Sequence, residues 1–299
     1  MPKIAHTTEQ LVESIEYAGT SPWNRATEIV SNFQNEPLFI ESLQNNHIDP
    51  LDKSTEGYAN ALSYYAQDYC STRAEMLSND ESAQILLLAN APYFVHIQKT
   101  MAHYEELRRH RRLDDGEWHH FTKELKPLAV WYNQQLSDYM YVQPESKISD
   151  INQALIEETL DYFPREETTV EKQLSDTTRG ARKEAVTRQL LDLTPVEYTP
   201  GTPEDDLRGG DIIIVYKGTR IKVDIKSSLD PIAKQRGGYD QLDKQGVTFA
   251  LPHSIRDRHG ALILFPGFTE GELGDNCYLN PPIFPQPPRV LAVALAQSL

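Results

Sequence analysis

The stretch GGDIIIVYKGTRIKVDIKSS, residues 209–228, is the most informative part of the chain. Residues 212–216 form a mostly β-branched run, and residues 220–226 alternate strictly between polar and apolar side chains. Lys217-Gly218 lies between the two runs as a two-residue hairpin loop, in which glycine supplies a positive φ. The pattern therefore predicts two antiparallel strands, at 211–216 and 219–227.

The short loop also predicts the register of this hairpin. If Tyr216 pairs with Thr219, Asp211 lies directly across from Asp224. Opposed carboxylates repel each other, and a divalent cation held by both would remove that repulsion. Mg²⁺ is suited to this role because it is a hard ion usually held by one or two carboxylates. Lys226 is two residues past Asp224 and is expected on the same face, where it can orient or help deprotonate an attacking water.

A second interpretation of the hairpin stays open at this point. Alternation of Ile and Val with Arg, Lys and Asp is also typical of an ordinary half-exposed strand. That interpretation does not explain the second carboxylate placed opposite the first, nor the glycine pair before it.

The chain as a whole divides into a helical region, residues 1–149, and a mixed region, residues 150–299. Apolar periodicity in the first region predicts helices at 24–45, 56–77, 81–112 and 116–141. The second region is predicted to hold helices at 150–162 and 176–193, and strands at 196–199, 211–216, 219–227, 247–251 and 261–265. This order predicts an α+β fold, with a helical N-terminal region followed by an α/β core.

The hairpin residues resemble a known motif. Asp211 followed by Asp224-Ile225-Lys226 on the next strand resembles the PD-(D/E)XK nuclease superfamily, for which twelve intervening residues are an ordinary spacing. The chain departs from the motif's name because Gly210 replaces the proline, and the second acid is Asp. The resemblance implies a restriction-endonuclease-like core in the order αβββαβ, with a mixed sheet flanked by helices.

A helix upstream extends the resemblance. Residues 180–184, GARKE, begin a helix that looks like the first core helix of the superfamily, in which a glutamate often completes the metal site. Glu184 is the matching residue. The alternative is a surface acid paired with Arg188 at i,i+4.

The resemblance implies hydrolysis of phosphodiester bonds with Mg²⁺ or Mn²⁺. The substrate is expected to be DNA, and the activity that of an endonuclease similar to the type II restriction enzymes. The implied metal ligands are Asp211, Asp224, the backbone carbonyl of Ile225, and Glu184. The implied catalytic residues are Lys226, Asp211, Asp224 and Glu184. The candidate nucleic-acid contacts are Arg182, Lys183, Arg188, Lys234 and Arg236.

Double-stranded DNA presents two strands, so a homodimer is expected. The alternative function is a non-catalytic nucleic-acid-binding or protein-interaction module that keeps the nuclease fold.

Composition limits the remaining classes of function. The formal net charge of −15 argues against nonspecific coating of nucleic acid or membrane, although residues 179–244 carry 12 basic and 11 acidic side chains. No apolar run approaches a membrane span, and the N-terminus has no signal core. Only Cys70 and Cys277 are present, which predicts free thiols and a cytoplasmic protein. The basic run Arg108–Arg112 fits either a helix C-terminus or a nucleic-acid contact.

Overall fold

The computed structural model describes residues 23–143, 150–192, 197–206, 210–216, 219–225 and 262–264. Helices dominate these ranges. In the first they are α2 (Asn24–Phe33), α3 (Pro37–Asn45), α4 (Glu56–Thr72), α5 (Asn79–His110), α6 (Asp115–His119), the π-helix η1 (His120–Leu125) and α7 (Lys126–Val142). Two more follow, α9 (Ile151–Leu160) and α10 (Glu167–Asp192). The predicted helical segments are confirmed, but 24–45 and 116–141 are each divided into shorter elements, and the helix predicted at 176–193 begins earlier, at Glu167.

Local sequence explains where several of these helices begin. Pro37 is the first residue of α3, where its missing N–H group is not needed for a helical hydrogen bond. Ser78 and Glu81 form a capping box at the start of α5, each side chain accepting a hydrogen bond from the other residue's backbone N–H. Asp114 and Glu117 form a second capping box, at the start of α6. These caps separate α4 from α5 and α5 from α6.

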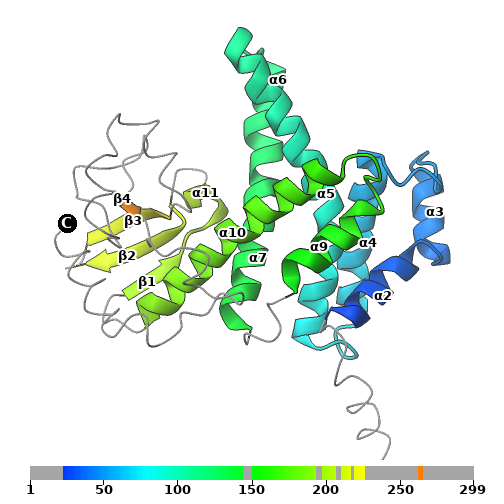
Figure 1. The fold of residues 1–299 in the computed structure, drawn as a ribbon, viewed down its shortest axis with the longest axis horizontal. Helices are drawn as coiled ribbons and strands as arrows, with labels where there is room; N and C mark the ends of the chain where they lie inside the picture. Colours follow the sequence, from blue (N-terminus) through cyan, green and yellow to red (C-terminus); the bar gives the residue numbers. More distant parts are fainter. Residues whose placement is uncertain are drawn as a thin grey trace, which may run out of the picture.

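The longest helix, α5, forms the centre of the helical part. Its first half is buried against α2, α4, α7 and α9, and its second half projects from the body with α6 and η1 beside it (Figure 1). Aromatic side chains fill the spaces between these helices. The rings of Phe39 and Tyr58 meet edge to face at 5.4 Å, and those of Phe94 and Tyr132 stack at 4.4 Å.

Four short strands lie at the other side of the molecule: β1 (Glu197–Pro200), β2 (Ile212–Tyr216), β3 (Thr219–Ile225) and β4 (Leu262–Leu264). They form one sheet in the order β1-β2-β3-β4, in which the first two pairs are antiparallel and β3 is parallel to β4. The short helix α11 (Pro203–Asp206) lies between β1 and β2 in the chain. Within the hairpin, Tyr216 pairs with Thr219 and Ile212 with Val223, so the predicted register is confirmed.

The predicted α+β class is wrong. The described residues are mostly helical, and their hydrophobic core is built by helices. Among the described residues, the sheet contributes Ile212, Ile214 and Val223 to that core, and Tyr198 and Ile225 pack against it partly buried. The share of the sheet is small because its longest strand has seven residues, whereas α5 has 32. The described residues therefore do not form an αβββαβ core in which helices flank a mixed sheet. The predicted strand at 247–251 lies outside the described residues.

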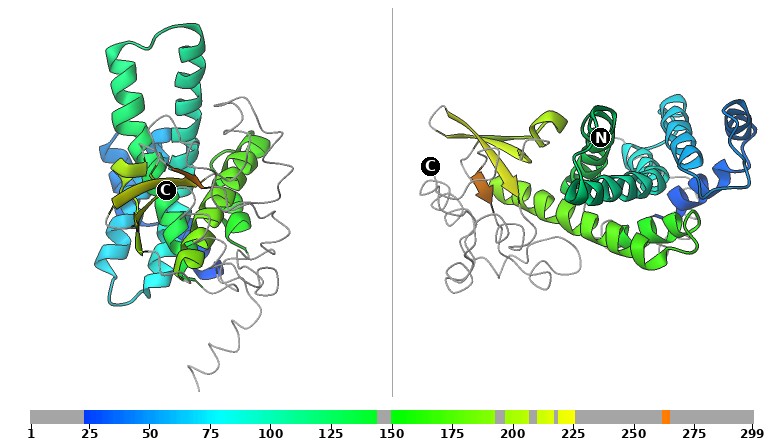
Figure 2. Two further views of the ribbon diagram at one scale, coloured as in Figure 1. Left: turned by 90° about the vertical axis from the view of Figure 1, so that its left-hand side faces the viewer. Right: turned by 90° about the horizontal axis from the view of Figure 1, so that it is seen from above.

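Helix α10 connects the two sides of the molecule (Figure 2). Its first half packs against α9, and it also packs along α7 and reaches the sheet, where the hydroxyl of Tyr198 in β1 lies 3.1 Å from the carbonyl oxygen of Arg188. One hydrophobic cluster runs from α2 through α10 to β2 and β3. The division of the chain at residue 150 stays a prediction. Within the described ranges, no helix is both long and apolar enough to cross a membrane.

Candidate active site

Asp211 lies at the start of the hairpin, immediately before β2. Its side chain is half-buried, and its Oδ2 atom accepts a hydrogen bond from the backbone N–H of Ile225. The observed register pairs Ile212 with Val223, so one further step along the two strands sets Asp211 opposite Asp224. The hydrogen bond to Ile225 is consistent with that step, because it ties the Asp211 carboxylate to the end of β3.

Hydrogen bonds hold the backbone at Asp211 against the segment that follows β1. The N–H of Gly201 donates to the carbonyl oxygen of Asp211 at 2.8 Å, and the N–H of Gly210 donates to that of Asp205 at 2.8 Å. A Cβ atom on Gly201 would lie 1.9 Å from the carbonyl oxygen of Gly210, so the two backbone segments approach too closely for any side chain. Gln134 of α7 donates to the carbonyl oxygen of Gly201 at 3.1 Å. The helical part therefore helps to position the residue.

The remaining hairpin residues of the predicted site are described in part. Asp224 occupies a position in β3 opposite Ile263 of β4, and Ile225 lies opposite Leu264. Lys226, Lys234 and Arg236 lie outside the described residues. In the ranges that are described, no group of three or more His, Cys, Asp or Glu side chains is arranged to hold a metal ion.

The predicted residues of α10 differ in exposure. Glu184 and Arg182 are partly exposed, whereas Lys183 and Arg188 are each only 5% exposed. Arg188 donates from Nη1 to Oδ1 of Asp138 in α7 at 2.6 Å. Lys183 and Arg188 were expected to contact nucleic acid. Such a contact would require both side chains to move out of their buried positions.

A polar cluster beside the sheet was missed by the sequence analysis. The hydroxyl of Tyr141 donates to Oδ2 of Asp192 at 2.6 Å, and the hydroxyl of Tyr198 lies 2.8 Å from Oδ1 of the same carboxylate. Burial, together with the neighbouring Tyr141 and Asp192, raises the pKa of Tyr198. The cluster joins α7, α10 and β1. No local signal could have revealed it, because Tyr141 and Asp192 are 51 residues apart in the chain.

The basic run at the tip of α5 is partly neutralised by acids. Arg109 pairs with Glu106 at 2.7 Å, and Arg111 forms two hydrogen bonds with the carboxylate of Glu117. The guanidinium of Arg108 lies over the ring of Trp118, 5.5 Å from its centroid. Helix α5 ends at His110, so Arg108 and Arg109 fall in its last turn, where cations interact favourably with the helix dipole.

Comparisons of the chain with protein families, with curated proteins and with solved structures found no match.

Proposed function

We propose that this protein is a metal-dependent nuclease that hydrolyses phosphodiester bonds in double-stranded DNA, acting as an endonuclease and as a homodimer. The observation that carries the proposal is the register of the β2–β3 hairpin, in which Ile212 pairs with Val223, so that Asp211 and Asp224 are the next residues in line. Like charges at opposed positions of a hairpin are destabilising unless something holds both. The proposal rests on these residues and their spacing, not on a fold class.

The donor set fits Mg²⁺, with Mn²⁺ as a substitute. Asp211, Asp224 and the carbonyl of Ile225 offer only oxygen ligands, which hard divalent cations prefer. Glu184 is the fourth proposed ligand, directly or through water. A bound Mg²⁺ would supply charge that stabilises the phosphate oxygens as negative charge develops on them.

The protein side chains would carry the remaining chemistry. Lys226 orients the attacking water and offsets charge on the phosphate. Hydrolysis then leaves a 5′-phosphate and a 3′-hydroxyl. Arg182 on the accessible side of α10, with Lys234 and Arg236, is proposed to contact the phosphate backbone, because such contacts contribute most of the affinity for nucleic acid.

The test is cleavage of supercoiled plasmid by the purified full-length protein with Mg²⁺ or Mn²⁺. Asp211→Asn is the sharpest variant, because the amide oxygen can still accept the hydrogen bond from Ile225 while the negative charge is lost. We expect at least a 100-fold loss of nicking in Asp211→Asn, Asp224→Asn and Lys226→Gln, the size of effect typical for one electrostatic group, of order 10²–10³. Asp176→Asn, a surface position on α10, makes the same charge change and should cleave normally.

A second measurement separates metal binding from turnover. Electron paramagnetic resonance of added Mn²⁺ should show binding by the wild type and weaker binding by Asp211→Asn. Metal binding without cleavage of plasmid, single-stranded DNA or RNA would contradict the nuclease and favour a non-catalytic module. Cleavage that survives in both Asp211→Asn and Lys226→Gln would contradict the site.

A further inference from the structure

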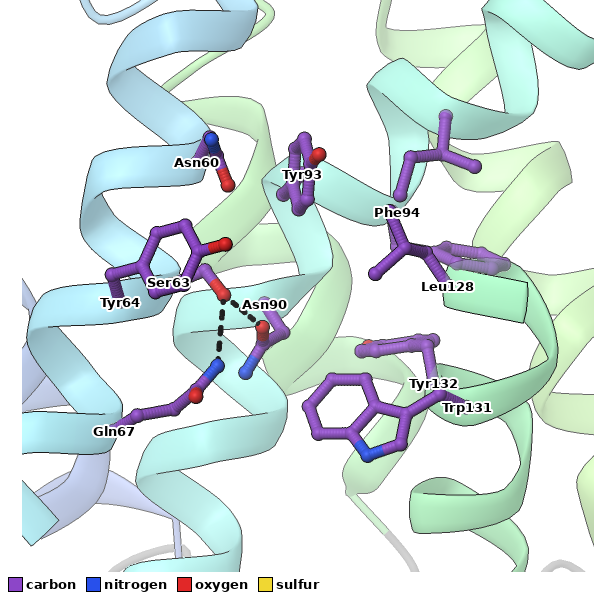
Figure 3. A pocket seen from close by; sticks show the side chains of 11 residues that line it. Asn60, Ser63, Tyr64, Gln67, Asn90, Tyr93, Phe94, Leu128, Trp131 and Tyr132 are labelled. Atoms are coloured by element: carbon purple, nitrogen blue, oxygen red, sulfur yellow. Dashed lines mark hydrogen bonds between the residues drawn. The ribbon is translucent and has the colours of Figure 1, made fainter. Parts of the chain in front are cut away.

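A cavity of about 340 Å³ lies between α4, α5 and α7 (Figure 3), and its lining includes no residue of the β2–β3 hairpin. Its size falls in the range of about 300–1,000 Å³ typical of small-molecule sites. The lining consists of Asn, Ser, Gln, Tyr, Trp, Phe, Leu and Ile side chains, none of which is charged at neutral pH. The proposed nuclease site uses none of them.

One wall of the cavity is aromatic. The rings of Phe94 and Tyr132 stack with their centroids 4.4 Å apart and their planes at 22°. Trp131 from α7 and Tyr93 from α5 are half-buried beside this pair, and Figure 3 shows their rings around the same space. Faces of aromatic rings favour flat, aromatic ligands, because such ligands stack on them.

The opposite wall is polar and held in place by hydrogen bonds. Ser63 donates to Oδ1 of Asn90 at 2.5 Å, and Asn90 donates to the carbonyl oxygen of Leu86 at 2.6 Å. Gln67 donates from Nε2 to the hydroxyl of Ser63 at 3.4 Å. Ser63 and Asn90 are only 5% and 4% exposed, so this network is a rigid base beneath the Gln67 amide.

The polar wall keeps hydrogen-bonding capacity for a ligand. Among the residues that the structure describes, none bonds to the carbonyl oxygen of Gln67 or to the amide of Asn60. Side-chain amides offer both a donor and an acceptor, so together they match a ring whose edge carries both. Asn and Gln make this kind of paired contact with the edges of nucleobases.

The surroundings disfavour a phosphate in this cavity. Burial raises the pKa of Tyr93, and Glu56, Tyr64 and Glu124 raise it further. No lining side chain is cationic, and the whole chain has a net charge of −15. The ligand is therefore expected to be uncharged where it enters the cavity.

We propose that this cavity binds a neutral, planar heteroaromatic ring of the nucleobase type, stacked on Trp131 and hydrogen-bonded along its edge by Gln67 and Asn60. The proposal does not depend on the nuclease proposal, because the two sites share no residue. The ring could be presented by a free nucleoside or by an unpaired base in a single strand. Both sources present the same chemistry to the cavity.

The test is isothermal titration of the full-length protein with adenosine, guanosine, cytidine and thymidine. We expect saturable binding of at least one nucleoside, and binding of its 5′-monophosphate that is about fivefold weaker or more. Trp131→Leu and Gln67→Leu should each weaken the nucleoside by about tenfold. The matched controls are Trp118→Leu and Gln135→Leu, two exposed positions outside the cavity that should leave the dissociation constant unchanged.

Gln67 is exposed, so its substitution keeps the core intact, and circular dichroism should confirm an unchanged fold. A short single-stranded oligonucleotide is titrated in parallel. Tighter binding of the oligonucleotide than of any nucleoside, lost in Trp131→Leu, would support a base in a strand as the source. The reverse order would support a free nucleoside.

Three results would overturn the proposal. The first is no binding of any nucleoside or oligonucleotide at millimolar concentration. The second is binding that both Trp131→Leu and Gln67→Leu leave unchanged. The third is competition by choline at equal concentration, which would identify a cation site formed by the aromatic rings instead.

Discussion

At the scale of single residues, two ionisable side chains of the helical part, the buried Glu158 and the half-buried His96, couple its stability to pH. Glu158 is 5% exposed, and burial, with a further contribution from Asp161, raises its pKa to about 7, although Lys53 and Ser31 oppose this shift. His96 packs against the ring of Phe163, and burial lowers its pKa to about 4. Neither group belongs to the two proposed sites.

The raised pKa of Glu158 predicts the direction in which the free energy of unfolding changes with pH. In the unfolded chain a glutamate titrates near 4.5, so between pH 4.5 and 7 the folded state binds more protons than the unfolded state. This stabilising contribution is fully present below pH 4.5 and is lost as the pH rises through about 7. Glu158→Gln cannot ionise, so at pH 8 we expect it to raise the free energy of unfolding by up to about 3 kcal/mol.

Urea unfolding of the wild type and of Glu158→Gln across pH 4–8 measures this effect. His96 acts in the opposite direction, because its stabilising contribution is present above pH 6.5 and falls as the pH drops through about 4. Both proteins contain His96, so the difference between the two curves isolates Glu158. Glu157→Gln, at the neighbouring exposed position, is the control. A difference curve that stays flat with pH would contradict the buried carboxyl.

At the scale of elements, two glycines differ in whether the structure has room for a side chain. Gly201 follows β1, where an added Cβ would meet the backbone of Gly210 at 1.9 Å. Gly180 lies inside α10, where an added Cβ would meet nothing within 4 Å. The first glycine permits a close approach of two backbone segments, and the second only weakens a helix.

Gly201→Ala should therefore destabilise the protein by more than about 1 kcal/mol, because the backbone beside Asp211 must move. Gly180→Ala should stabilise it by about 1 kcal/mol, because alanine is the better helix former. Thermal unfolding of the two variants provides the measurement, and each is the other's control for the added methyl group. Equal effects of the two substitutions would show that the backbones at Gly201 and Gly210 do not approach as closely as described.

At the scale of the whole molecule, α10 joins the helical core to the sheet. Arg188 is buried in this joint, with its guanidinium paired to Asp138 and lying 4.1 Å from the centroid of the Tyr141 ring. Within the described part of the chain, no group accepts a hydrogen bond from its Nε atom. A buried cation of this kind depends on its partner, since losing the partner leaves an uncompensated charge.

Asp138→Ala is expected to destabilise the protein by about 1–2 kcal/mol, below the value for a fully buried pair because Asp138 is 55% exposed. Asp138→Ala combined with Arg188→Met should recover most of that loss, because the double variant buries no charge. Urea unfolding of the wild type, both single variants and the double variant forms a complete cycle. A double variant that loses the sum of the two single effects would mean that the pair is not coupled.

The sequence by itself determined the local structure of this protein. Periodicity and the short Lys217-Gly218 sequence are contained within a few neighbouring residues, so they predicted the helices and the hairpin register that pairs Ile212 with Val223. The same local signals predicted that Asp211 and Asp224 lie opposite each other, one step beyond the Ile212–Val223 pair. Whether these residues act in hydrolysis stays a prediction.

Only the tertiary structure decided which elements build the core. The prediction of an α/β core was wrong because strand patterns indicate that strands exist, but not how much apolar surface they bury compared with the helices. Burial of Arg188, the Tyr141–Asp192–Tyr198 cluster and the cavity at Trp131 each join segments far apart in the chain. Such contacts arise from packing between helices, and no short stretch of sequence contains both partners.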